Sequence, residues 1–174
     1  GRGVLYADKG LYALAIADFE RAKTLNPNLK GLHSNLGVAW YYRKSYRTAI
    51  ENYDIEIKNN PNNPIAFFNR GLCHAELDHH QEALADMDRT LEVRPDFYWA
   101  LCYKGDILVK LQQPLTAKLV YEKAVGLAPE KSYADKQLAA AETMIKNFYI
   151  LQAGVFQNQD NALKIVQTAI DHEY

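Results

Sequence analysis

Cysteine is scarce in this sequence, with only Cys73 and Cys102 among 174 residues. Two thiols do not make a disulfide framework. Cys73 is typical of a small buried apolar residue, and Cys102 has no neighbouring histidine pair that would make it a nucleophile. Long apolar runs are missing too: 48% of the residues are hydrophobic, but no run approaches the roughly 18 residues of a membrane-spanning helix. We therefore expect no membrane insertion.

A dominant charge of either sign is also lacking, because 20 lysines and arginines face 21 aspartates and glutamates. This balance argues against nucleic acid and anionic membranes as partners. No motif of a kinase, protease or hydrolase is present, so we expect no enzyme and no cofactor. His79 and His80 fall in a predicted turn without a third ligand at fixed spacing, so we expect no metal site.

What the sequence does contain is an internal repeat of 34 residues. Three residue types keep one phase over most of the chain, which no chance pattern explains. Neither helix of a short repeat can bury its apolar face alone, so neighbouring repeats must stack. The recurring residues are Pro27, Pro61, Pro95 and Pro129; Gly3, Gly37, Gly71 and Gly105; and Ala15, Ala49, Ala83 and Ala117.

One period, residues 63–95, predicts two antiparallel helices. The first begins at Pro64, since proline suits the first helical turn and Asn63 suits the cap before it. The second begins near Gln81 and ends before Pro95, which cannot continue a helix. Gly71 and Ala83 are small where the two helices cross, so their backbones can approach closely.

These residues resemble the tetratricopeptide repeat (TPR) pattern. The resemblance implies an all-α fold, a right-handed superhelix of antiparallel helix pairs, or α-solenoid. Residues 1–129 correspond to four repeats, the first truncated at its start. The matching residues are Leu36, Gly37, Trp40, Ala49, Tyr53 and Pro61; Gly105, Ala117, Tyr121, Ala124 and Pro129; and Gly3, Tyr6, Ala15, Phe19, Ala22 and Pro27.

After Pro129 the phase breaks, and residues 130–174 are interpreted as a degenerate fifth repeat or as C-terminal capping helices. Eleven extra residues are close to three helical turns, so a first helix lengthened from about Ser132 toward Leu151 would keep its face. Ala162, Val166 and Ala169 imitate the spacing of a second helix.

The resemblance also implies that the first helix of each repeat lines a concave groove. Asn35 and Asn69 stand 34 residues apart there, and an amide side chain can both donate to and accept from an extended peptide. Packing between repeats is the alternative role, and Trp99 and Tyr42 are the residues most expected to be exposed. The predicted groove residues are Ser34, Asn35, Val38, Tyr41, Tyr42, Phe68, Asn69, Leu72, Trp99, Tyr103 and Asp106.

We expect a protein-interaction module that binds a partner's peptide segment in this groove and acts as an adaptor or scaffold. The alternatives are a regulatory or targeting array of a larger enzyme, and a scaffold that forms homodimers. Some TPR cochaperones clamp a C-terminal carboxylate with lysine, arginine and asparagine. The corresponding positions here are Ser34, Val38, Asn69, Trp99 and Tyr103, of which only Asn69 matches.

Two expectations concern the protein's origin. The chain lacks an initial methionine and begins part-way into a helix, as an excised fragment would. Residues 2–6 and 11–19 are similar to the first repeat of NlpI-type bacterial lipoproteins, which are periplasmic adaptors. We expect a cytoplasmic protein, with the bacterial periplasm as the alternative that this similarity implies.

Overall fold

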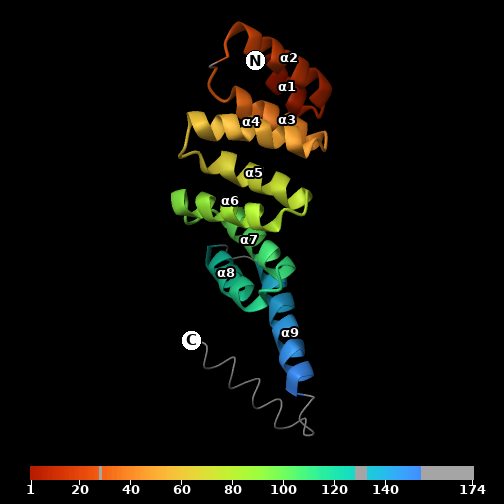
Figure 1. Ribbon diagram of the computed structural model, residues 1–174, viewed down its shortest axis with the longest axis vertical. Coiled ribbons are helices and arrows are strands. Elements are labelled where there is room, and N and C mark those ends of the chain that lie inside the picture. Colours follow the sequence, from red (N-terminus) through yellow and green to blue (C-terminus); the bar gives the residue numbers. More distant parts are fainter. Residues whose placement is uncertain (28, 128–132, 154–174) are drawn as a thin grey trace. The chain divides into compact units, whose positions relative to one another are not determined.

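The computed structural model describes residues 1–27, 29–127 and 133–153, and these residues form helices joined by short turns (Figure 1). The described residues contain no strand, as the all-α prediction requires. Contacts divide the chain into two compact units, Gly1–Ala100 and Leu101–Tyr174. Each unit is described by itself.

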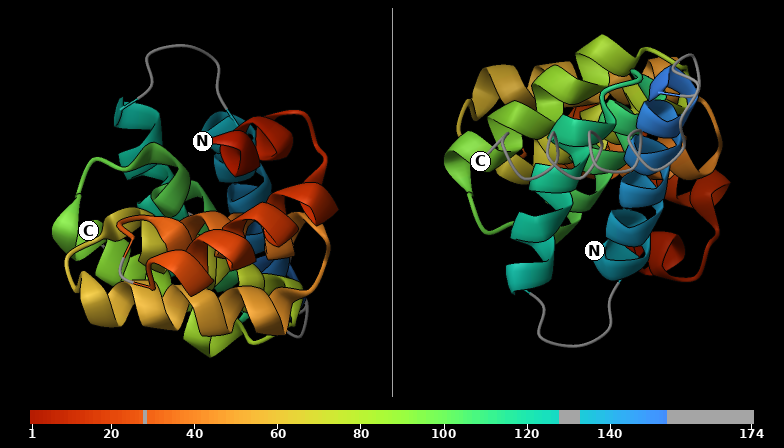
Figure 2. Two further views of the ribbon diagram at one scale, coloured as in Figure 1. Left: turned by 90° about the horizontal axis from the view of Figure 1, so that it is seen from above. Right: turned by 90° about the horizontal axis from the view of Figure 1, so that it is seen from below.

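The first unit is a stack of helix hairpins. Its helices are α1 (Arg2–Asp8), α2 (Tyr12–Leu25), α3 (Leu32–Tyr42), α4 (Tyr46–Asn59), α5 (Pro64–Glu76) and α6 (His80–Val93). Each helix packs on the next in the chain, and α3 also contacts α5 directly. The end-on view shows α2, α3 and α4 side by side (Figure 2, left). First helices of successive hairpins are therefore neighbours.

The second unit contains most of α7 (Tyr98–Lys110), followed by α8 (Pro114–Leu127) and α9 (Tyr133–Ala153). The α8 and α9 helices pack against each other. At 21 residues, α9 covers the segment for which the sequence predicts a lengthened first helix. The predicted second helix with Ala162, Val166 and Ala169 lies outside the described residues, and the division into four repeats plus a fifth stays a prediction.

The helix boundaries follow from local chemistry. The Asn63 side chain accepts hydrogen bonds from the backbone amides of Ile65 and Ala66, and Pro64 occupies the first turn of α5, as predicted. The turn between the two helices of a hairpin uses a left-handed residue each time. These residues keep the 34-residue phase and are Gly10, Lys44, Asp78 and Gln112, with φ between 58° and 72°.

Each hairpin is held by a large side chain lying against a glycine. The ring or thioether of the second helix covers a glycine of the first helix, 16 residues earlier in the chain. A Cβ added to Gly37 would come within 2.6 Å of the Tyr53 ring, closer than real atoms approach. The four pairs are Gly3 with Phe19, Gly37 with Tyr53, Gly71 with Met87, and Gly105 with Tyr121.

A charged group also joins three helices of the first unit. Arg70 of α5 donates to Asp86 of α6 at 2.6 and 2.9 Å and to Asp54 of α4 at 2.7 Å. The hydrogen bonds to Asp86 are the largest cause that raises the pKa of Arg70. The Asp86 side chain is only 4% exposed, so its charge depends on this partner.

None of the helices that the structure describes combines the length and apolar character that crossing a bilayer requires.

We expect Gly105→Ala to destabilise the protein by about 1–3 kcal/mol, because the new methyl group would overlap the buried Tyr121 ring. Gly126→Ala is the matched control, since a Cβ on Gly126 meets nothing within 4 Å and alanine favours the helix by up to about 1 kcal/mol. Urea unfolding followed by circular dichroism measures both. Equal stability of the two variants would contradict the crossing described above.

We expect Arg70→Met to lower the free energy of unfolding by about 3–5 kcal/mol, because it leaves the Asp86 carboxylate buried without a partner. Lys23→Met is the control: its 3.2 Å pair with Glu20 is exposed, so its loss costs at most about 1 kcal/mol. Chemical unfolding of both variants tests this. A small effect at Arg70 would mean that Asp86 is stabilised in another way.

Candidate functional site

The predicted groove residues of the first unit lie on neighbouring helices. Ser34, Asn35 and Val38 belong to α3, and Asn69 and Leu72 belong to α5, which α3 contacts directly. Asn35 is exposed, and the other four are half-buried. The surface of these two helices is thus uncharged at the predicted positions, with amide, hydroxyl and apolar groups.

Aromatic rings cluster at the C-terminal end of α3. The Tyr42 side chain is 58% exposed, which agrees with the sequence-based expectation. Its ring stacks on that of Tyr12 from the preceding hairpin, with centroids 4.8 Å apart and an interplanar angle of 7°. Tyr41 meets the edge of Tyr42 at 5.6 Å. The stacking holds an exposed ring in place, and sequence reasoning missed Tyr12 because it belongs to another repeat.

A second aromatic group lies on and beyond α5. The ring centroids of Phe68 and Phe97 are 4.9 Å apart. Trp99 is 49% exposed, as the sequence predicts, and its ring meets that of Tyr98 at 5.1 Å. Phe68 therefore packs within the first unit, whereas Trp99 presents apolar surface to solvent.

The two asparagines of the predicted ladder are not equivalent. Burial raises the pKa of Tyr53 above its ordinary value, and a side-chain hydrogen bond with Asn69 offsets part of that rise. Asn69 thus has a partner within the protein. The residue that corresponds to Tyr53 in the preceding repeat is Phe19, which has no hydroxyl, and Asn35 is exposed. Asn35 is therefore the better placed of the two for a ligand.

In the second unit, Asp106 is tied to its own helices. Its carboxylate accepts hydrogen bonds from the Tyr121 hydroxyl at 2.7 Å and the Tyr133 hydroxyl at 2.8 Å. Burial raises the pKa of Asp106, while the two hydroxyl donors act to lower it. The pKa of Tyr133 rises to about 12, chiefly by burial. These bonds favour a structural role for Asp106, whereas Tyr103 is 38% exposed.

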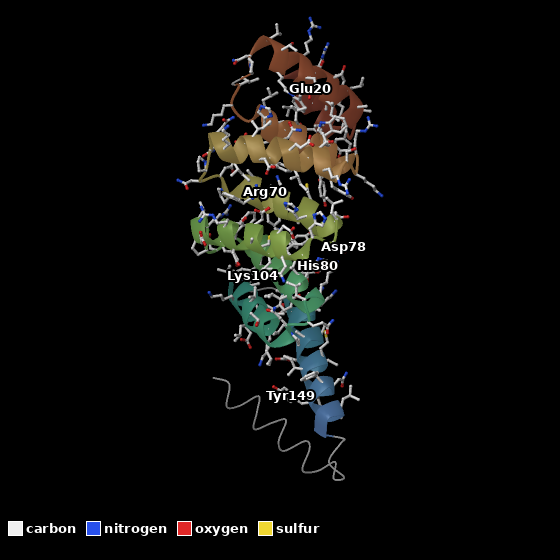
Figure 3. All side chains as sticks on the ribbon, viewed as in Figure 1. Glu20, Arg70, Asp78, His80, Lys104 and Tyr149 are labelled. Carbon is white, nitrogen blue, oxygen red and sulfur yellow. The ribbon has the colours of Figure 1, made fainter. Side chains whose placement is uncertain are left out.

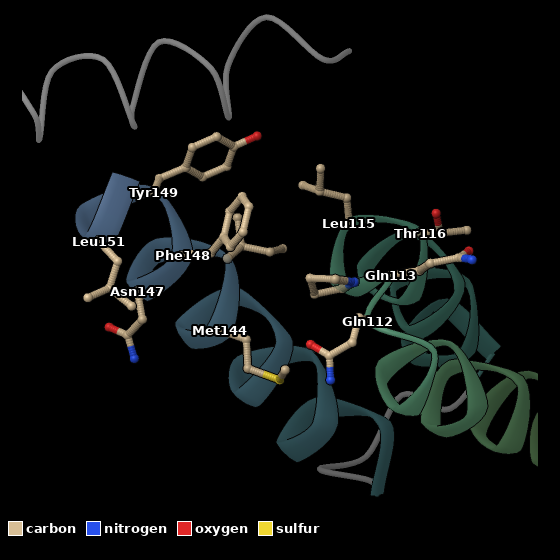
Figure 4. Close-up of a pocket in the computed structure, with 11 residues that line it drawn as sticks. Gln112, Gln113, Leu115, Thr116, Met144, Asn147, Phe148, Tyr149 and Leu151 are labelled. Atoms are coloured by element: carbon tan, nitrogen blue, oxygen red, sulfur yellow. The ribbon is translucent and has the colours of Figure 1, made fainter. Parts of the chain in front are cut away.

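A cavity of about 660 Å³ lies between the start of α8 and the C-terminal half of α9 (Figure 4). Its described lining is mainly apolar and amide, and none of these residues is a carboxylate, histidine or cysteine. It therefore offers no acid, base or nucleophile for a reaction. Its described lining residues are Gln112, Gln113, Pro114, Leu115, Thr116, Met144, Ile145, Asn147, Phe148, Tyr149 and Leu151.

The histidines near the α5–α6 turn do not gather metal ligands. His79 is exposed, and the imidazole of His80 lies 3.8 Å from the Asp78 carboxylate. The described residues contain no group of three or more histidine, cysteine or acidic side chains that could hold a metal ion. Burial is the main cause that lowers the pKa of nearby His74, which favours its neutral form.

Both thiols are buried and unpaired by disulfide, as expected from the sequence. Burial raises the pKa of Cys73 to about 12. The unfolded chain loses this proton first as the pH rises above the ordinary thiol pKa. The contribution of Cys73 to stability is therefore present below that pKa and falls as the pH approaches 12.

We expect Cys73 to resist thiol reagents in the folded protein at pH 8. Its thiolate fraction is on the order of a thousandfold below that of an ordinary cysteine, and burial blocks access further. A Cys102→Ala variant isolates this thiol, and Ellman's reagent with and without denaturant measures it. Stoichiometric labelling of the folded variant at the rate of a free thiol would contradict the buried position.

Comparison with known proteins gives the family. Tetratricopeptide repeat models match residues 35–96 and residues 1–29 and 100–131. Hsp70-Hsp90 organizing protein 2 of Arabidopsis thaliana is 26% identical over 112 residues, which cover 64% of this chain and 20% of that protein. The chain thus spans about a fifth of that relative's length.

Two solved structures share the fold. A crystal structure of MamA superposes with a TM-score of 0.77 at 17% identity and covers 99% of this chain and 96% of the other. The first TPR of Spaghetti (RPAP3), bound to the HSP90 peptide SRMEEVD, gives 0.64 at 22% identity and covers 66% and 90%. The sequence matches and the fold agree, and the chain belongs to the tetratricopeptide repeat family.

Proposed function

We propose that this protein is an adaptor that binds an extended peptide segment of a partner across the first helices α3 and α5. The observation that carries the proposal is the uncharged surface of these adjacent helices, with an exposed amide at Asn35 and an exposed, fixed ring at Tyr42. Exposed aromatic surface of this kind marks sites of protein interaction.

The chemistry of the surface fits a peptide backbone. An asparagine side chain carries a donor pair and an acceptor, so Asn35 can pair with both groups of an extended main chain. Tyr42 supplies a large contact area with little conformational freedom to lose, because stacking on Tyr12 already orders its ring. Trp99 offers a second exposed ring for an apolar side chain of the ligand.

The relatives support peptide binding in general. The Spaghetti domain is bound to an HSP90 peptide, and the Arabidopsis relative is named for organizing Hsp70 and Hsp90. The positions that correspond to a carboxylate clamp carry no cation here: Ser34, Val38, Trp99 and Tyr103 are all uncharged. We therefore propose a ligand recognised through its backbone and apolar side chains, and not through a terminal carboxylate.

The proposed role requires no catalysis. TPR domains act by binding, and the described thiols, histidines and carboxylates are either buried, exposed singly or paired with one another. The remaining groove residues, Tyr41, Phe68, Leu72 and Asp106, stay predictions. The enzyme-linked and homodimeric alternatives also stay predictions, as do the cytoplasmic and periplasmic locations.

We expect a double variant, Asn35→Ala with Asn69→Ala, to lose partner proteins that the wild-type chain captures from a cell lysate. The loss should exceed about tenfold, since two amide hydrogen bonds contribute roughly 1–3 kcal/mol together. Quantitative mass spectrometry of the captured proteins measures it. Asn59→Ala with Asn60→Ala is the matched control, because both residues are exposed at the end of α4.

Circular dichroism first establishes that both double variants keep the helix content of the wild type. Because Asn69 bonds to Tyr53, a Tyr53→Phe variant reports the effect of that contact alone. Partners that persist unchanged in the Asn35 and Asn69 variant, or that disappear equally in the control, would exclude the α3–α5 surface as the binding site.

A further inference from the structure

One edge of the first unit carries cations that no acidic group neutralises. The turns that join α1 to α2 and α3 to α4 lie at the same edge of this unit (Figure 1). Lys9, Arg43, Lys44 and Arg47 belong to these turns or to the residue that follows, and all four are exposed. None of them forms an ion pair with a residue that the structure describes. We call these four residues the basic edge.

Other cations of the first unit are engaged. Arg2 pairs with Asp18, Arg70 with Asp54 and Asp86, Arg94 with Asp96, and Lys23 with Glu20. Lys30 and Lys58 also lack a described ion pair, but they belong to the linkers at the opposite edge (Figure 1). The uncompensated positive charge is therefore concentrated at the two turns.

Helix stability does not account for the whole set. Lys9 and Arg43 cap the C-terminal ends of α1 and α3, where a cation is favourable. Arg47 lies in the first turn of α4, where the helix dipole disfavours a cation. Asp8 and Glu51 are the nearest acidic residues in the sequence, yet neither is close enough to pair with these cations.

The basic edge adjoins the tyrosine cluster. Tyr12 follows the first turn and Tyr42 precedes the second, and their rings stack at 4.8 Å. Tyr46 follows the second turn and lies 5.5 Å from Tyr41. The cations are thus arranged around a fixed aromatic platform, which joins two hairpins and holds their turns together.

The charge changes sign one hairpin further along the same edge. The turn between α5 and α6 carries Glu76, Asp78 and Glu82, and Figure 3 labels Asp78 there. A long polyanion such as nucleic acid would meet these carboxylates and be repelled. A short anionic segment would reach the cations and the rings without meeting them.

We propose that the basic edge and its tyrosine platform bind an acidic, aromatic or apolar segment of a partner protein. Its carboxylates pair with Lys9, Arg43, Lys44 and Arg47, and an apolar side chain packs on the exposed face of Tyr42. This surface is distinct from the α3–α5 surface proposed above and shares only Tyr41 and Tyr42 with it. It therefore stands or fails independently of that proposal.

The test uses a fluorescein-labelled peptide of alternating glutamate and phenylalanine, with fluorescence anisotropy as the readout. We expect saturable binding to the wild-type protein that weakens as salt is added. Arg43→Glu with Lys44→Glu should weaken binding by at least about tenfold. A peptide with glutamine in place of glutamate should bind at least about tenfold more weakly than the glutamate peptide.

Lys30→Glu with Lys58→Glu is the matched control, because it changes the net charge equally at the opposite edge. It should alter the affinity by no more than about twofold. The Asn35→Ala and Asn69→Ala variant should bind the glutamate peptide as the wild type does, which separates this surface from the α3–α5 site. Equal losses in both charge-reversal variants, an absence of binding, or tighter binding of a single-stranded oligonucleotide would overturn the proposal.

Discussion

The close approach of two helices over a glycine is the constraint on which the rest of this structure depends. In each described hairpin a large side chain of the second helix lies on a glycine of the first, as Tyr53 lies on Gly37. This contact sets the distance between the helices and leaves no room for a methyl group. Because it recurs at one interval, successive hairpins stack in register, and the first helices α3 and α5 become neighbours. The candidate surface exists only because of that stacking.

Buried polar groups then connect helices that the glycine contacts leave independent. In the first unit, Arg70 precedes the repeat glycine and bridges α4, α5 and α6. In the second unit, Asp106 follows the corresponding glycine and accepts from hydroxyls of α8 and α9. The two units use opposite charges for the same purpose. Each group is worth its desolvation cost only while its partners remain in place, so these bonds select one arrangement of the helices.

The surface chemistry separates this chain from relatives with which it shares a fold. The positions of a carboxylate clamp are uncharged here, and the free cations lie at the turns, beside stacked tyrosines. A shared repeat architecture therefore does not transfer a ligand from one protein to another. What the family supplies is a rigid frame, and side chains at a few phases of the repeat decide which peptide the frame can hold.

The sequence by itself determined the period, the helices of each repeat and their boundaries, because caps, prolines and glycines act within a few residues along the chain. It also indicated that Tyr42 and Trp99 are exposed. Only the tertiary structure decided that Asn69 bonds to Tyr53, that Tyr12 stacks on Tyr42, and that Asp106 is held by Tyr121 and Tyr133. These contacts join residues 15 to 30 positions apart across different helices, so they depend on how the helices pack and not on local pattern.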